Sequence, residues 1–181
     1  MNKMTRPTVV AIPGSTRQKS VNHSLIKAIT ELTAQRLEIT VYDGLGRLPQ
    51  FNPDDDQENV AANVSDFRQL LREADGILIC TPEYARGVPG TLKNAIDWTI
   101  SSGEFPHKPT LLITASTDGT FGHRALMETL KAIEAKNIDN LQLVIQHAKT
   151  KISNENRITD ESTRHAVEEL LDRFVWTIQN S

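Results

Sequence analysis

The sequence predicts an α/β protein in which a five-stranded parallel sheet lies between two layers of helices. Short apolar runs, rich in β-branched residues, alternate along the chain with longer segments whose apolar positions recur at helical spacing. Some of the apolar runs are nearly continuous, as expected of strands that are covered on both faces. Regular alternation of strand and helix favours a three-layer α/β/α arrangement with right-handed crossovers.

Five short segments are predicted to be strands. The first is β-branched and apolar until Pro13 and Gly14 end it, the second alternates, and the third is a nearly continuous apolar run. A count of five strands favours the order 2-1-3-4-5 that flavodoxin-like sheets have. In chain order the five segments are residues 8–12, 37–42, 76–81, 110–115 and 141–146.

Five segments with helical periodicity follow these strands. The last gives the strongest signal, because its apolar residues lie at i, i+3, i+4, i+7, i+8 and i+11. A loop rich in glycine, proline and aspartate is expected at residues 43–59. The helices are expected at residues 21–36, from Val60 through Leu71, at 88–100, at 125–136, and from Val167 through Ile178.

Length and composition limit the class of protein. The 181 residues fit a single domain spanning residues 1–181, and the net charge of −3 argues against a protein that coats nucleic acid. No apolar stretch approaches the ~20 residues of a membrane helix, so neither nucleic acid nor a membrane is an expected partner. The single cysteine, Cys80, suits a reducing cytoplasm, and the histidines lack metal-ligand spacing, so no metal is expected.

The loop after the first strand suits an anion. It connects a buried strand to a helix start, where free backbone N–H groups and the helix dipole favour negative charge. Ser15, Thr16 and Ser20 add hydroxyl donors, and Arg17 adds a planar guanidinium. A bound phosphate is therefore predicted here. The alternative is that Ser20 caps the helix and the other side chains are solvated.

The loop after the third strand suits a flat ligand. Two prolines and two glycines between residues 81 and 90 predict an extended path and a sharp turn. Its backbone amides could bind a heterocycle that Tyr84 stacks on. The alternative is a rigid loop whose Tyr84 packs on its own neighbours. Trp98 and Cys80 are expected to be packed in the core, with the thiol inert.

Two motifs carry a resemblance to a known family. They are Gly14-Ser15-Thr16-Arg17 with Ser20 and Asn22, and Pro82-Glu83-Tyr84 followed by Pro89-Gly90-x-Leu92-Lys93-Asn94-Ala95-Ile96-Asp97-Trp98. Together they resemble the NADPH-dependent FMN reductase family, which includes chromate and quinone reductases and azoreductase-like flavoproteins. The resemblance implies a flavodoxin-like fold, bound FMN, NADPH or NADH as electron donor, and a homodimer or homotetramer.

The resemblance also implies which residues hold the flavin. The phosphate loop would comprise Ser15, Thr16, Arg17, Ser20 and Asn22, and the loop along the ring would comprise Pro82, Glu83, Tyr84, Ala85 and Arg86. A third flavin loop would hold Ser116, Asp118 and Gly119. The chain departs from the family pattern at Ala85, where Asn is usual, and at Phe121 and His123 in the third loop.

The resemblance predicts an FMN-dependent NAD(P)H oxidoreductase that passes electrons to a small acceptor: a quinone, a flavin, an azo compound or a metal oxyanion. Because a flavin carries the chemistry, no catalytic side chain is expected. We expect Phe121, with the space left by Ala85, either to favour flat apolar acceptors or to lie in a subunit contact. One alternative is a flavin-binding sensor or electron carrier with little turnover, and another is a scaffold for a different phosphate ligand.

Overall fold

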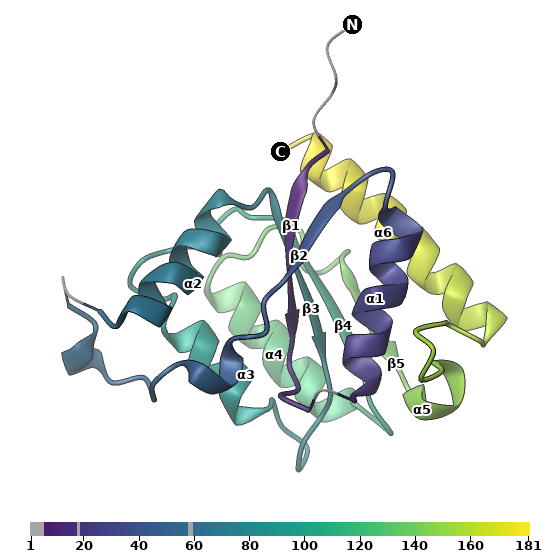
Figure 1. Cartoon of the computed structure of the whole chain (residues 1–181), viewed down its shortest axis with the longest axis horizontal. Coiled ribbons are helices and arrows are strands. Elements are labelled where there is room, and N and C mark those ends of the chain that lie inside the picture. Colours follow the sequence, from purple (N-terminus) through teal and green to yellow (C-terminus); the bar gives the residue numbers. More distant parts are fainter. Residues whose placement is uncertain (1–5, 18, 58–59) are drawn as a thin grey trace, which may run out of the picture.

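The structure of the chain is a computed structural model that describes residues 6–17, 19–57 and 60–181. Five strands form one parallel sheet in the order β2-β1-β3-β4-β5, which confirms the predicted order (Figure 1). Because all strand pairs are parallel, the carboxyl ends of the strands share one edge. The strands are β1 (Thr8–Pro13), β2 (Glu38–Val41), β3 (Gly76–Thr81), β4 (Thr110–Ala115) and β5 (Gln142–Ile145).

The described residues form six α-helices and two short 3₁₀ helices, where the sequence predicted five helices. The helix missed by the prediction is α5, whose four residues are too few to show a period. The α-helices are α1 (Val21–Thr33), α2 (Ala62–Glu73), α3 (Gly90–Asp97), α4 (Thr120–Ala132), α5 (Ala148–Lys151) and α6 (Glu161–Gln179). The 3₁₀ helices η1 (Leu45–Arg47) and η2 (Pro53–Asp55) lie within the predicted loop 43–59.

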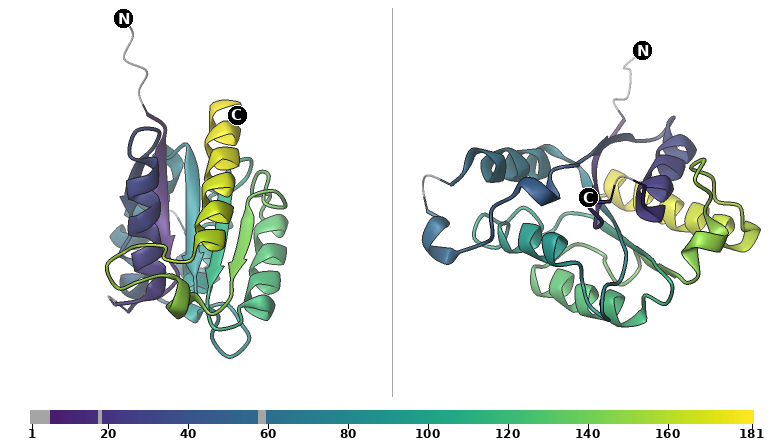
Figure 2. Two further views of the ribbon diagram at one scale, coloured as in Figure 1. Left: turned by 90° about the vertical axis from the view of Figure 1, so that its right-hand side faces the viewer. Right: turned by 60° about the horizontal axis from the view of Figure 1, so that its bottom comes forward.

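Two hydrophobic clusters cover the two faces of the sheet and confirm the three-layer architecture. Helices α1, α5 and α6 pack on one face, and α2, α3 and α4 pack on the other (Figures 1 and 2). Cys80 is fully buried on the first face, and burial raises the pKa of its thiol far above the usual range, so it is inert as expected. Trp98 is buried on the second face.

β1 and β3 approach each other closely at the carboxyl edge. The N–H of Gly14 donates to the carbonyl of Cys80 at 2.8 Å. A Cβ at residue 14 would lie only 2.3 Å from Oγ1 of Thr81, so the chain can leave β1 along this path only with a glycine there. This close approach places the loop after β1 directly beside the loop after β3.

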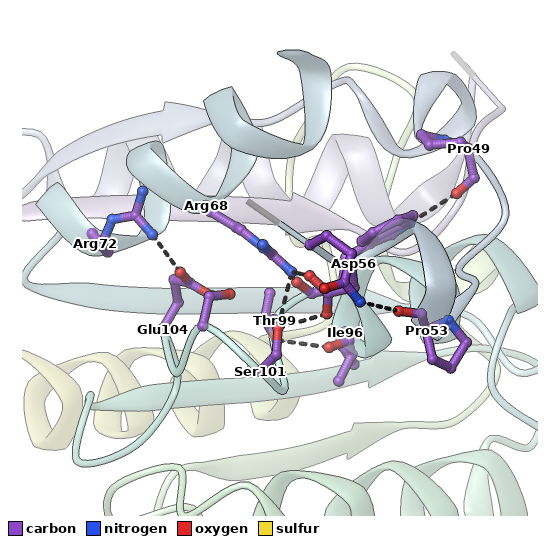
Figure 3. A network of polar contacts seen from close by, with 12 residues as sticks. Pro49, Pro53, Asp56, Arg68, Arg72, Ile96, Thr99, Ser101 and Glu104 are labelled. Atoms are coloured by element: carbon purple, nitrogen blue, oxygen red, sulfur yellow. Dashed lines mark hydrogen bonds and ion pairs between the residues drawn. The ribbon is translucent and has the colours of Figure 1, made fainter. Parts of the chain in front are cut away.

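A polar network holds the long segment between β2 and α2 against the helical layer. Nε of Arg68 donates to the carbonyl of Trp98 at 2.6 Å, and Nη2 donates to Oδ1 of Asp56 at 2.7 Å. The second carboxylate oxygen of Asp56 accepts from Oγ of Ser101 at 2.6 Å (Figure 3). Beside it, Arg72 pairs with the buried carboxylate of Glu104 at 2.6 Å. In the part of the chain that is described, no helix has both the length and the apolar character to span a bilayer.

Candidate functional site

A cavity of about 420 Å³ lies at the carboxyl edge of the sheet, the edge that the right-hand view of Figure 2 turns toward the reader. Four chain segments form its walls: the loops after β1, β3 and β4, and the segment from α5 to residue 154. The lining residues are Ser15, Arg17, Lys19, Ser20, Val21, Asn22, Pro82, Glu83, Tyr84, Ala115, Ser116, Thr117, Ala148, Lys149, Ile152 and Asn154. The structure therefore brings the three predicted loops together in one site.

Three cations line this cavity. Arg17 and Lys19 come from the loop after β1, and Lys149 comes from α5. Within the described part of the chain, none of the three has an acidic partner within ion-pair distance. Unpaired cations beside hydroxyl groups and a helix start are suited to a phosphate.

Asn22 forms part of the cavity floor and is 2% exposed. Its Nδ2 donates to the carbonyl of Ala115 at 3.2 Å, which joins the start of α1 to the end of β4. Its Oδ1 is buried and has no hydrogen-bond partner within the described residues. Buried acceptors are normally paired, so this oxygen is suited to a hydroxyl donor on a ligand.

Ser20 both lines the cavity and caps α1. Its Oγ accepts the N–H of His23 at 3.3 Å, as in an ordinary N-cap. The same Oγ lies 2.8 Å from Nδ1 of the His23 ring. The capping role that the sequence left as an alternative is therefore real, and it coexists with a position at the cavity.

Tyr84 and Glu83 connect the loops around the cavity. The hydroxyl of Tyr84 lies 3.3 Å from Oγ of Ser15, while 49% of the tyrosine remains exposed. The carboxylate of Glu83 accepts the N–H of Gly122 at 2.6 Å, and its own N–H donates to Oγ of Ser116 at 3.3 Å. Glu83 thus ties the loop after β3 to the start of α4.

Ala85 and Arg86 form a tight turn and are not among the lining residues. Both have positive φ angles, 48° and 59°, and the flanking Tyr84 and Gly87 exchange backbone hydrogen bonds of 3.1 and 2.8 Å. Left-handed conformations at both central residues define a type I′ turn, which favours Asn or Gly. The guanidinium of Arg86 lies 4.7 Å from the centre of the Phe121 ring, so this ring has Arg86 as its neighbour.

Five other predicted site residues do not line the cavity. Thr16 lines a smaller neighbouring cavity, which also contains Arg47. Gly119, with φ of +93°, is the N-cap of α4, which starts at Thr120, before the predicted residue 125. Bonds from Thr120 and Gln146 to Asp118 lower the pKa of its carboxyl, which indicates a role in holding the loop. The remaining two are Ala85 and Arg86.

His123 is enclosed behind the third loop and does not line the cavity. Its Nδ1 lies 2.9 Å from Oγ1 of Thr114, and its Nε2 lies 2.6 Å from Oε1 of Gln142. Because the amide oxygen of Gln142 only accepts, Nε2 carries the proton and Nδ1 accepts from Thr114. Burial lowers the pKa of His123, against the opposing effect of the bond to Gln142. The ring is therefore a neutral link between β4, α4 and β5.

Sequence reasoning missed Lys19, Lys149 and Asn154. Lys19 lies inside the predicted phosphate loop and could have been found by its charge. Lys149 and Asn154 follow the fifth strand, and the shortness of α5 concealed that the chain turns back over the site. The rule that ligands bind beyond strand ends, applied to every strand, would have included them.

Comparisons with known proteins agree with this geometry. A family model described as NADPH-dependent FMN reductase matches residues 7–150. A quinone reductase of Pseudomonas putida is 30% identical over 173 residues, 92% of each chain. An NAD(P)H-dependent FMN reductase of Pseudomonas aeruginosa is 31% identical over 169 residues, 90% of each chain. The flavoenzyme FerB, an NAD(P)H:(acceptor) oxidoreductase from Paracoccus denitrificans, superposes with a TM-score of 0.77 at 25% identity, covering 96% of this chain and 98% of that one.

The flavodoxin-like sheet, the cationic cavity at its carboxyl edge and the family match together define a flavin oxidoreductase. The chain belongs to the NADPH-dependent FMN reductase family, and it is an oxidoreductase that uses FMN and NAD(P)H. The residues present fit FMN: the unpaired cations suit its phosphate, and the orphaned oxygen of Asn22 suits a ribityl hydroxyl.

Proposed function

We propose that this cavity binds FMN and that the chain delivers electrons from NAD(P)H to a small quinone. The observation that carries the proposal is the convergence of three unpaired cations and an orphaned buried acceptor in one cavity of suitable size. The names of the relatives from Pseudomonas putida and Paracoccus denitrificans support a quinone or another small acceptor.

The side chains divide the work of binding. Arg17, Lys19 and Lys149 hold the phosphate, and Asn22 accepts a hydrogen bond from the sugar chain. Tyr84, half exposed and in contact with Ser15, forms another part of the cavity wall. When bound, FMN supplies the two-electron transfer between nicotinamide and acceptor, so these residues bind and orient rather than react.

We further propose that residues 1–181 are one domain that works in the cytoplasm as a homodimer or homotetramer, without nucleic acid or membrane. Both hydrophobic clusters share a single sheet, which supports one domain. Tyr84, Phe121 and Trp176 are 49%, 44% and 65% exposed, which supports contact between copies. Light scattering of the purified protein should give a mass of two or four chains, and a mass of one chain contradicts the assembly.

A steady-state assay separates the enzyme from the electron carrier. Purified protein should be yellow, with flavin absorbance near ~450 nm, and should oxidise NAD(P)H continuously while a quinone is present. A carrier would bind FMN but oxidise NAD(P)H only to about the extent of its own flavin. The carrier hypothesis depends on the two departures Ala85 and Phe121, and both lie outside the cavity lining, so the structure gives no specific support to that alternative.

A further inference from the structure

The hydroxyl of Ser20 is in hydrogen-bond contact with the ring of His23 in the first turn of α1. Oγ of Ser20 already accepts the N–H of His23 at 3.3 Å, and Nδ1 of the ring lies 2.8 Å away. A serine hydroxyl has a single hydrogen to donate. The contact between Oγ and Nδ1 therefore takes one of two forms, and the proton on the ring decides which.

In the first form, the Ser20 hydroxyl donates to an unprotonated Nδ1 and has nothing left to donate. In the second, Nδ1–H donates to Oγ and the hydroxyl hydrogen of Ser20 is free to point into the cavity that Ser20 lines. A fully ionised phosphate only accepts hydrogen bonds, so the hydroxyl of Ser20 can donate to it only in the second form.

The other ring nitrogen favours full protonation in that second form. Nε2 of His23 is buried without a hydrogen-bond partner within the described residues, and Oδ1 of Asp43 lies 3.8 Å from it. If only Nδ1 carried a proton, the lone pair of Nε2 would point toward the carboxylate of Asp43, which is unfavourable. If both nitrogens carried protons, the positive ring would face that carboxylate, which is favourable. The other charged side chains nearby in sequence, Lys19 and Lys27, are exposed.

We propose that phosphate binding at this cavity takes up one proton on His23, which makes His23 a positioning residue that controls the hydroxyl of Ser20. The inference rests on the proposed function, because it takes the phosphate of FMN as the ligand. Histidine is the side chain that commonly changes charge between pH 5 and 8, so FMN should bind more tightly on the acidic side of that range than the phosphate alone predicts.

The experiment compares FMN and riboflavin dissociation constants from pH 5.5 to 8.5 for wild type, His23→Asn and a control, His165→Asn, which changes a ring that is exposed on α6. The asparagine amide presents either N–H or C=O to Ser20 by rotation and needs no proton. The phosphate itself titrates near pH ~6, and that effect cancels in the ratio of wild type to variant.

The wild-type Kd for FMN, divided by that of His23→Asn, should rise with pH by up to about tenfold per unit, the limit for one linked proton. For riboflavin, the same ratio should not change with pH. The pH dependence of FMN binding in His165→Asn should match that of wild type, and that in Ser20→Ala should match that of His23→Asn. Calorimetry in two buffers of different ionisation enthalpy counts the protons taken up when FMN binds. Wild type should take up more protons than Ser20→Ala or His23→Asn.

A constant ratio across pH, or the same pH course for riboflavin, overturns the proposal. If His23→Asn does not fold, the proton count for wild type and Ser20→Ala decides alone. Failure of FMN to bind at any pH contradicts the proposed function. FMN binding whose proton uptake is independent of His23 and Ser20 contradicts only this inference.

Discussion

Two polar regions of the molecule use similar residues in opposite ways. Around Arg68, the charged groups have partners inside the protein (Figure 3). The guanidinium donates to Asp56 and to a backbone carbonyl, and Ser101 donates to the second carboxylate oxygen of Asp56. In the cavity, Arg17 has no acidic partner and Asn22 has a buried oxygen without a hydrogen bond, as far as the described residues extend. Polar groups that hold the fold have hydrogen-bond partners within the protein, whereas the groups that we propose bind a ligand have open positions.

The same contrast separates two histidines near the site. His123 has both ring nitrogens bonded, and it joins three elements of the fold. Nδ1 of His23 contacts Ser20, while its Nε2 has no hydrogen bond to any described residue and lies 3.8 Å from Oδ1 of Asp43. His123 should therefore affect stability, and His23 should affect binding.

The largest expected effect comes from breaking the closed region. Arg68→Met leaves the carboxylate of Asp56 without its cation, and both side chains are only 9% exposed. Removing one partner of a buried pair costs about 3–5 kcal/mol, and we expect a loss at the lower end in urea unfolding. FMN affinity of the folded protein should stay nearly constant.

The exposed pair of Arg36 and Asp172 provides the control for that experiment. Its side chains are 39% and 69% exposed, so Arg36→Met should change the free energy of unfolding by less than about 1 kcal/mol. Equal losses for Arg68→Met and Arg36→Met would contradict a structural role for the buried network.

In the cavity, Arg17→Ala should leave the free energy of unfolding unchanged and weaken FMN binding. A charge-assisted hydrogen bond contributes about 1.5–3 kcal/mol, which corresponds to a roughly tenfold to hundredfold rise in Kd. Fluorescence titration measures this, and riboflavin affinity should not move. Arg124→Ala, an exposed change on α4, serves as control; a similar FMN loss there would show a general charge effect instead.

Gly122→Ala tests whether the cavity depends on the close contact between α4 and the loop after β3. An added Cβ would lie 2.8 Å from the carbonyl oxygen of Gly87 and 3.1 Å from Cγ of Glu83. Displacing this backbone should cost about 1–2 kcal/mol in unfolding free energy and should also weaken FMN. Wild-type stability with wild-type FMN affinity would mean that the loop adjusts freely.

Acidification should weaken the fold through His123. Its pKa is lowered by burial, so the unfolded chain, whose histidine keeps the ordinary value near 6.5, binds the proton first. Stability is therefore complete above that value and falls as the pH drops below it. Unfolding measured between pH 7.5 and 5 should show a shallower fall in His123→Gln and an unchanged fall in His107→Gln. A wild-type slope in His123→Gln would contradict the assignment.

The smallest effect concerns the turn at residue 85. Ala85 has a left-handed φ of 48°, a conformation that asparagine adopts more readily than alanine. Ala85→Asn should therefore stabilise the protein by about 0.5 kcal/mol, a gain taken from the left-handed strain of alanine. Ala125→Asn, in the exposed part of α4, should instead destabilise it by about 0.5 kcal/mol through helix propensity. Loss of stability in both variants would contradict the conformational explanation.

The sequence predicted most of the fold because burial on both faces leaves a clear pattern. Residues 76–81 and 110–115 are continuous apolar runs, and the structure makes them β3 and β4 with the same bounds. The count of five strands favoured the observed order but did not determine it. The prediction missed the four-residue α5, the 3₁₀ helices η1 and η2, and the first turns of α4 and α6, which begin at Thr120 and Glu161, because these segments lack an apolar period.

The site was predictable as a set of loops but not as a set of contacts. Residue type does not reveal that Ala85 sits at positive φ or that the carboxylate of Glu83 is occupied by the N–H of Gly122. Nor does it reveal the hydrogen-bond contact between Ser20 and His23, which depends on the orientation of the His23 ring. These features arise from how separate segments meet at the edge of the sheet.

The central claim is that the open polar groups of the cavity are reserved for the phosphate of FMN. Titration of flavin-free wild-type protein with FMN and with riboflavin, at matched pH and salt, tests it most directly. FMN should bind at least about a hundredfold more tightly, because two or more charge-assisted bonds of about 1.5–3 kcal/mol are lost with the phosphate. Equal affinity for the two flavins would contradict the claim.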